Sequence, residues 1–149
     1  MKLSRYTLLP LLALTLGAER GGYEYSPVDA HTLHYRVEWR LIHAGDVRFT
    51  WSPHVTFYTA DLQVQSGGLV SKLHRVKDDY HVQMNNALCA QTVKIHAEEG
   101  KRRKQTTITF DRDKGKVFFY EKDLIKNTEN TKEVEAAGCV HDYFGGLAK

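Results

Sequence analysis

The stretch "LHYRVEWRLIHAGDVRFTW", residues 33–51, alternates apolar and polar side chains on both sides of Gly45. An alternation with a period of two is typical of a β-strand that buries one face. The apolar positions are odd-numbered on both sides of the glycine: Leu33, Tyr35, Val37, Trp39 and Leu41, then Val47, Phe49 and Trp51. The stretch therefore predicts a β-hairpin with one apolar face.

The shared parity of the two arms predicts the length of the hairpin loop. A two-residue loop would pair odd positions with even ones, so that each apolar side chain would face a polar one. A three-residue loop of His43, Ala44 and Gly45 instead pairs Leu41 with Val47, and it places glycine at the left-handed last position that such loops favour. The same register pairs Trp39 with Phe49 and Val37 with Trp51. Gly45 is thus predicted to be a structural turn residue.

A second hairpin is predicted in "TVKIHAEEGKRRKQTTITF", residues 92–110. Its apolar positions change from odd to even between the two arms, which fits a two-residue turn at Glu99 and Gly100. The turn signal "DRDKGK" follows, and "VFFYE", residues 117–121, reads as a strand that returns along Phe110.

The remaining segments complete the predicted fold. Strand-like alternation occurs in "TFYTADLQVQ" (56–65) and "DDYHVQM" (78–84), whereas "GGLVSKLHRV" (67–76) fits either a short helix or an extended segment. The polar residues 127–135 are predicted to form a loop. The expected fold class is mainly β: an antiparallel sheet of sequential hairpins, built as an open curved sheet or partial barrel, with at most one short helix.

Length and composition limit the function classes. A chain of 149 residues with 42% hydrophobic and 26% charged residues is typical of one globular domain. The formal net charge of +3 is small for a protein that binds nucleic acid through a basic face, so no nucleic-acid partner is expected. The spacing of the histidines, cysteines and acids matches no metal or cofactor set, so none is expected.

The N-terminal residues "MKLSRYTLLPLLALTLGAERGG" have the layout of a secretory signal peptide. Lys2 and Arg5 precede an apolar run, residues 8–18, that ends in small residues. The run is about half of the roughly 20 residues that a membrane-spanning helix needs, so no transmembrane anchor is expected after cleavage. We expect a signal peptide over 1–18, a linker over 19–30 and one β-rich domain over 31–149, in the periplasm or cell envelope; the alternative is a buried amphipathic N-terminal helix.

Cys89 and Cys139 are an even pair of cysteines in a chain that is expected to be exported. Disulfides persist in oxidising compartments, so the pair is predicted to be bridged. Closing a loop of this length would contribute about 4 kcal/mol on the chain-entropy model. The alternative is two buried thiols, whereas a zinc site or thioredoxin-type pair would need a second cysteine close by.

The segment "CVHDYFGG", residues 139–146, holds the adjacent residues His141 and Asp142. This pair invites comparison with the His-Asp pair of metal-dependent phosphohydrolases, but such a site needs three or four convergent ligands. A hydrogen-bonded structural pair at the head of a turn or helix is the favoured interpretation. The competing hypothesis is a hydrolase of envelope polymers or phosphate esters that is centred on His141 and Asp142, with Glu98 or Glu121 as partners.

A basic cluster occupies the tip of the second hairpin: Lys101, Arg102, Arg103 and Lys104. In an exported protein such a cluster could contact anionic headgroups. The favoured interpretation is a solvated hairpin tip whose charges discourage edge-to-edge aggregation.

Taken together, the first hairpin, "SGGLVSKLHRVKDDY", "LCAQTVKIHAEEGKRRKQTTITFD" and "CVHDYFGGL" resemble an exported bacterial family known as domain of unknown function 3108. The resemblance runs from about Leu33 to Leu147. It implies a periplasmic or envelope-associated β-rich protein, and it supplies no catalytic residue that could be transferred to His141 or Asp142. Members of the family usually continue through further strands, so the resemblance also implies a domain that is truncated at its C-terminal end.

The sequence therefore predicts a non-enzymatic exported protein whose apolar sheet face binds a hydrophobic ligand, either a lipid or another envelope protein. The face is rich in aromatic residues, although such residues most often fill a core. Two alternatives stand beside this hypothesis: the hydrolase described above, and a truncated fragment without independent function. The sequence indicates no oligomeric state.

Overall fold

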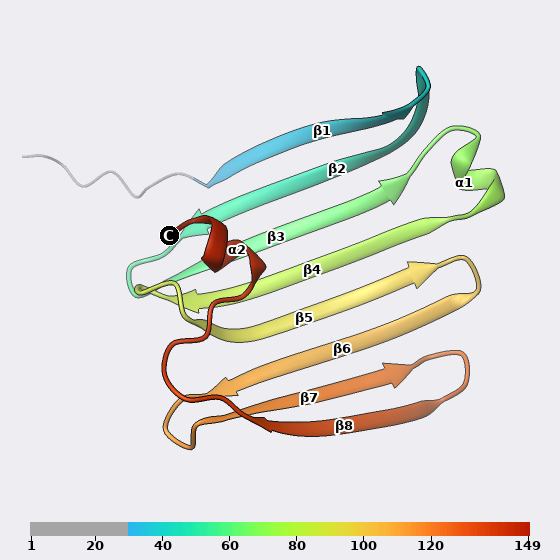
Figure 1. The fold of residues 1–149 in the computed structure, drawn as a ribbon. Helices are drawn as coiled ribbons and strands as arrows, with labels where there is room; N and C mark the ends of the chain where they lie inside the picture. Colours follow the sequence, from blue (N-terminus) through green and yellow to red (C-terminus); the bar gives the residue numbers. More distant parts are fainter. Residues whose placement is uncertain (1–29) are drawn as a thin grey trace, which may run out of the picture.

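The computed structural model describes residues 30–149, so the predicted signal peptide and nearly all of the predicted linker lie outside the described residues. The described chain forms one open, eight-stranded antiparallel sheet in the order β1-β2-β3-β4-β5-β6-β7-β8 (Figure 1). The strands are β1 (His31–Trp39), β2 (Ile42–Pro53), β3 (Phe57–Ser66), β4 (Val76–Asn85), β5 (Ala90–Glu99), β6 (Arg102–Asp111), β7 (Lys116–Asp123) and β8 (Thr128–Glu135). This meander confirms the predicted fold class.

Two short helices accompany the sheet. The ambiguous segment after β3 contains α1 (Val70–Leu73), and α2 (Tyr143–Leu147) lies near the end of the chain. The sequence indicated at most one. Both are too short to form without the sheet that they contact. Among the described residues, none of the helices is long and apolar enough to cross a membrane.

The two faces of the sheet differ in polarity because cross-strand partners share a face. One row of partners runs from Trp51 through Ala60, Val82 and Val93 to Ile108, and we call its side the apolar face. The opposite side, the polar face, carries rows such as Arg48, Gln63, Asp79 and His96.

The core lies on the apolar face and is small. Its buried residues are Ala60, Val82, Met84 and Val93. Partly buried aromatic and aliphatic side chains surround them: Phe49, Trp51, Tyr58, Ile95, Ile108, Phe110 and Phe144. A single sheet has no second layer to cover it. Only the middle of its apolar face is buried, by neighbouring side chains of the curved sheet and by a short covering segment.

The first hairpin turns at a different place from the predicted one. Trp39 pairs with Ile42, so that Arg40 and Leu41 form a two-residue turn, both with positive φ (49° and 67°). Ala44 is an extra residue between His43 and the next pair, which is a β-bulge. The predicted three-residue loop is therefore wrong. The bulge restores the odd-with-odd pairing that the loop was expected to supply, and Tyr35 pairs with Val47 and Leu33 with Phe49.

Gly45 lies within β2, beside the bulge, and it is not a turn residue as predicted. Its φ is not positive. A Cβ atom at this position would come within 2.5 Å of the Gln65 carbonyl oxygen on β3. Glycine is thus required because the backbone of the neighbouring strand passes close to it.

The later hairpins follow the sequence more closely. Glu99 pairs with Arg102, so the predicted two-residue turn is present but consists of Gly100 and Lys101, one residue later than predicted. Gly100 has a φ of 58°, as a turn of this kind requires. Phe110 pairs with Val117, which confirms the predicted return strand.

The predicted loop over residues 127–135 is instead the edge strand β8. All residues of β8 are exposed, so neither of its faces shows an apolar period. It is paired along β7 and carries two ion pairs across that ladder, Lys116 with Glu133 and Lys122 with Glu129. The prediction failed because an edge strand in water on both faces has no burial contrast for a sequence pattern to record.

Candidate functional site

The last part of the chain, residues 136–149, leaves the β8 edge and returns across the apolar face to the ends of β2, β3 and β4 (Figure 1). We call it the C-terminal segment. The Ala136 amide donates to the Gly115 carbonyl, and the Ala90 amide donates to the Val140 carbonyl, both at 2.8 Å. The Phe144 ring then packs on Phe49 at 5.2 Å between centroids. The segment thereby covers one end of the apolar face.

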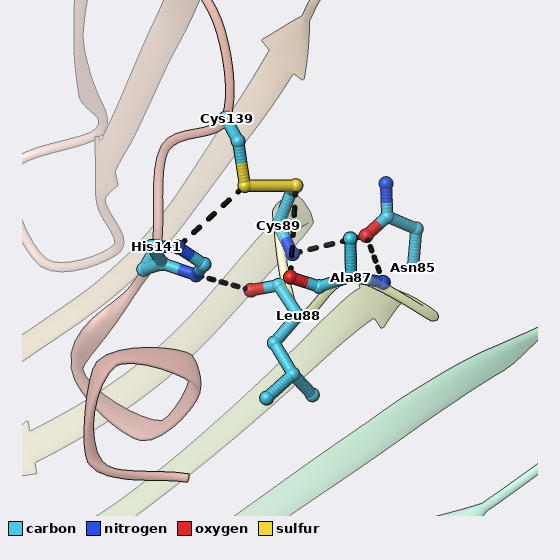
Figure 2. The surroundings of a disulfide bond; sticks show 6 residues. All are labelled: Asn85, Ala87, Leu88, Cys89, Cys139 and His141. Atoms are coloured by element: carbon cyan, nitrogen blue, oxygen red, sulfur yellow. Dashed lines mark hydrogen bonds between the residues drawn. A yellow bond between two sulfur atoms is a disulfide. The ribbon is translucent and has the colours of Figure 1, made fainter. Parts of the chain in front are cut away.

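A disulfide between Cys89 and Cys139 joins the C-terminal segment to the loop between β4 and β5 (Figure 2). This is the bridge predicted from the sequence, and the described residues contain no cysteine outside it. The loop is shaped by Asn85, whose Oδ1 accepts hydrogen bonds from the amides of Ala87 and Cys89, both at 3.0 Å. Sequence reasoning missed Asn85, although an Asx turn of this kind is typical of asparagine after a strand.

His141 and Asp142 both have structural contacts. The ring Nδ1 of His141 lies 2.9 Å from the Leu88 carbonyl oxygen, and Nε2 lies 3.6 Å from Cys139 Sγ (Figure 2). Asp142 is the N-cap of α2, where its carboxylate accepts from the amides of Phe144 (3.1 Å) and Gly145 (2.9 Å). Both side chains thus contact backbone atoms, and the pair lies at the head of a helix.

The two acids proposed as catalytic partners of His141 are engaged elsewhere. Ala90, at the start of β5, donates its amide hydrogen to Val140, the residue before His141. Glu98 lies at the other end of β5, which at the rise of a strand is roughly 26 Å from Ala90. It is hydrogen-bonded to His96 at 3.4 Å, and this bond holds the pKa of the Glu98 carboxyl below its usual value. Glu121 forms an ion pair with Lys104 at 2.7 Å. The structure brings neither acid to His141.

The basic cluster at the β5–β6 hairpin lies beside carboxylates on the neighbouring strands. Arg102 is 4.0 Å from Glu99, Lys104 is bonded to Glu121, and Arg103 is the cross-strand partner of Glu98. Because Arg102, Arg103 and Lys104 each have an acid beside them, the hairpin tip does not present a uniformly positive surface, and the solvated tip is the simpler interpretation.

The longest run of exposed residues on the apolar face lies on the first hairpin, along β1 and the start of β2. We call it the apolar stripe: Leu33 (49% exposed), Tyr35 (54%), Val37 (44%), Trp39 (62%) and Ile42 (43%). The sequence grouped Tyr35 and Trp39 with Phe49 and Trp51 as one aromatic face. The structure divides that set, because Phe49 and Trp51 pack against the core whereas Tyr35 and Trp39 face solvent.

The two edges of the sheet are unlike. β1 pairs with β2 on one side and, within residues 30–149, has no strand on the other. It contains no lysine or proline, and the side chains that it places on the apolar face carry no acid, lysine or arginine. β8 instead places Lys132, the partner of Phe119, on the apolar side of the sheet. An inward-pointing charge is a known protection of an edge strand against further pairing, and β1 lacks it.

The polar face holds two hollows, and in one of them two side chains are hydrogen-bonded to each other. A hollow of about 670 Å³ lies beside His34, Arg36 and Arg48, and a second, of about 490 Å³, lies over β3 to β6. In the second, His81 bonds Asp61 at 2.7 Å. Among the described residues, no group of three or more histidines, cysteines or acids is placed to hold a metal ion.

One acid of the apolar face was missed by sequence reasoning. Asp78 is 7% exposed, and it shares its face with the core residue Val82. Its Oδ1 accepts a hydrogen bond from the Glu98 amide at 3.0 Å. Burial raises the pKa of the Asp78 carboxyl, and the nearby charges of Glu99 and Asp79 add to the rise. The sequence signal for this site is its place in the alternation, because Asp78 stands between Val76 and Tyr80 in the set of positions that is otherwise apolar.

Comparison with known proteins identifies one family. A family model described as "Protein of unknown function (DUF3108)" matches residues 34–148, which includes almost the whole sheet and the C-terminal segment. No curated protein and no solved structure matches the chain.

Proposed function

The chain belongs to this family of proteins of unknown function, and we propose that it is an exported, non-enzymatic binding protein that receives an extended apolar segment of another envelope protein along β1. The observation that carries the proposal is the apolar stripe beside an unprotected sheet edge. The two features occur on the same strand, so one partner can satisfy both.

The apolar stripe supplies the hydrophobic part of the interaction. Its residues are between 43% and 62% exposed, and they lie next to one another on one face of β1 and β2. Contiguous exposed apolar surface marks interaction sites more often than it marks ordinary protein surface. Each 100 Å² of this surface that a partner covers would contribute about 2.5 kcal/mol before the entropic cost of association.

The β1 edge supplies the directional part. Backbone N–H and C=O groups on the outer side of an edge strand are open to pairing with an added strand. A partner strand that alternates apolar and polar residues would continue the apolar face with one set of side chains. Its other set would lie beside Arg36 and Glu38 on the polar face. A strand is favoured over a lipid because the stripe is an exposed surface along an edge.

Export is supported by two features of different kinds. The residue pattern of positions 1–18 is that of a secretory signal, and the described chain contains a disulfide. Disulfides persist in the periplasm and are rare in reducing compartments. Export gives the proposed partner its class, which is a protein of the cell envelope.

Binding of a strand along β1 can be tested with a fluorescent peptide in which valine and threonine alternate. The peptide has about nine residues, to match the 9 residues of β1. Fluorescence anisotropy should show binding to the wild-type protein. Leu33→Lys should weaken it at least tenfold, because a lysine would be buried on the apolar side of the joined sheet. His34→Lys is the matched control, since it places the same charge on the polar face one residue away and should leave binding intact.

Two other outcomes would each overturn the proposal. Equal weakening by both lysine variants would show that charge alone, and not the apolar stripe, governs the interaction. Co-sedimentation with vesicles of phosphatidylethanolamine and phosphatidylglycerol, without peptide binding, would replace the strand with a lipid surface. Thermal melts of both variants distinguish lost binding from lost folding.

A further inference from the structure

The two sulfur atoms of the disulfide lie in different environments. Cys89 is 1% exposed, whereas Cys139 is exposed at the surface. In thiol–disulfide exchange a thiolate attacks one sulfur and the other leaves. Access therefore selects Cys139 as the sulfur that an external thiol would attack and Cys89 as the one that leaves.

The hydrogen bond to Leu88 determines which nitrogen of His141 carries a hydrogen. A backbone carbonyl only accepts, so Nδ1 must be the donor at 2.9 Å. In the neutral ring Nε2 then has a lone pair, and this atom lies 3.6 Å from Cys139 Sγ (Figure 2). The next charged group along the chain, the Asp142 carboxylate, is occupied by the amides at the start of α2.

After reduction, the same contacts would treat the two thiols differently. A Cys139 thiol can donate to Nε2, and transfer of its proton gives a thiolate beside an imidazolium whose second N–H still bonds the Leu88 carbonyl. A Cys89 thiol faces the Ala87 carbonyl oxygen at 3.8 Å. A carbonyl accepts a hydrogen bond only from the protonated thiol, so it favours that form at Cys89.

We infer that Cys139 is a thiol–disulfide exchange site, with His141 as the base that accepts its proton, and that the site reacts stoichiometrically with a dithiol or a small thiol. A thiolate RS⁻ attacks Cys139 Sγ, the Cys89–Cys139 bond breaks, and Cys89 Sγ departs with the electron pair and takes a proton. A second thiolate then attacks the RS sulfur of the mixed disulfide, and Cys139 leaves as a thiolate beside His141. The balance is one protein disulfide and two thiols converted to two protein thiols and RSSR.

Opening the disulfide would loosen the C-terminal segment. Without it, the remaining ties that the structure describes are a few hydrogen bonds, among them Ala90 N–H to Val140, and the packing of Phe144 on Phe49. A helix of 5 residues such as α2 has no stability of its own. Reduction would therefore uncover the end of the apolar face that this segment shields. The exchange site itself does not depend on the proposed function.

Glutathione and iodoacetamide are suitable probes. The oxidised protein is incubated with glutathione, quenched with acid and mapped by mass spectrometry, and the mixed disulfide should be found on Cys139. In Cys89→Ser, where Cys139 is the single thiol, alkylation at pH 6 should be on the order of tenfold faster than in the double variant that adds His141→Gln. Adding His34→Gln in place of His141→Gln is the control and should leave the rate unchanged.

The inference fails if glutathione is found on Cys89, or if alkylation is equal with and without His141. Hydrogen exchange gives a second readout that does not depend on the variants. Reduction of the wild-type protein should deprotect the amides of Phe144 and Gly145, while those of β3 and β4 remain protected. Unchanged protection of α2 would contradict the proposed release, and general loss of protection would show that the whole sheet unfolds instead.

Discussion

At the scale of single residues, Asp78 is an ionisable side chain in a buried position, where apolar residues are usual. It is a carboxyl on the face that holds the core, and its one hydrogen bond comes from the Glu98 amide. Gly45 is the opposite case. Only glycine fits there, because the β3 backbone leaves no space for a Cβ atom. The environment of each residue comes from a neighbouring strand: β5 supplies the amide that bonds Asp78, and β3 supplies the carbonyl that limits the space at Gly45.

Asp78→Asn should raise the free energy of unfolding at pH 7. The native state holds the Asp78 proton to a higher pH than the unfolded state does, because burial raises its pKa. Its contribution to stability is therefore complete below the unfolded pKa of about 3.9 and is lost as the pH rises through the native pKa. Asparagine removes the buried charge, while its Oδ1 can still accept from the Glu98 amide.

Urea unfolding at pH 7 and at pH 3.5 measures this effect. The gain of Asp78→Asn over the wild type should be present at pH 7 and should shrink at pH 3.5. Asp79→Asn, the adjacent substitution on the polar face, is the control and should not reproduce the pattern. A destabilised Asp78→Asn at pH 7 would instead indicate that the carboxylate itself is needed by the fold.

At the scale of elements, turns and bulges determine the register, whereas alternation determines the faces. The first hairpin combines a two-residue turn with a bulge at Ala44, and the result has the same parity as a three-residue loop. Sequence parity alone does not separate these two solutions. In the second hairpin no such bulge occurs between the paired strands, and the change of parity correctly predicted a two-residue turn.

Leu41→Gly should stabilise the protein by about 1 kcal/mol. Leu41 is 94% exposed and has a φ of 67°, a conformation that costs a side chain with a Cβ but not glycine. Leu73→Gly is the control: Leu73 is 87% exposed within α1, where glycine should destabilise by about 0.5–1 kcal/mol. Chemical denaturation of both variants checks the opposite signs, and a loss of stability in Leu41→Gly would show that the leucine makes a contact of its own.

At the scale of the whole molecule, the disulfide compensates for a single-layer architecture. The core is small, and the cover on its open side includes the short segment around α2. The bridge joins this cover to the sheet across a sequence separation of 50 residues. A constraint of this length restricts the unfolded chain as well as positioning the segment.

Replacing both cysteines with serine should therefore lower the free energy of unfolding by about 4 kcal/mol on the chain-entropy model. Guanidinium unfolding of the double variant and of the wild-type protein checks the value. Reduced wild-type protein is the control, because it lacks the bridge without a substitution. A loss of less than about 1 kcal/mol would mean that the packing of the C-terminal segment holds the fold without the bond.

The sequence by itself determined the class of the fold, the two faces of the sheet and the candidate pairing of Cys89 with Cys139. The fold class and the two faces follow from the alternation of apolar and polar residues within short segments. The candidate disulfide follows from the number of cysteines. Only the tertiary structure decided the register of the first hairpin, the identity of β8 as a strand and the return of the C-terminal segment over the core. It also placed His141 against Leu88 and Cys139. The physical reason is that a bulge can replace a loop residue, an edge strand in water has no apolar period, and a covering segment is positioned by contacts with residues distant in the chain.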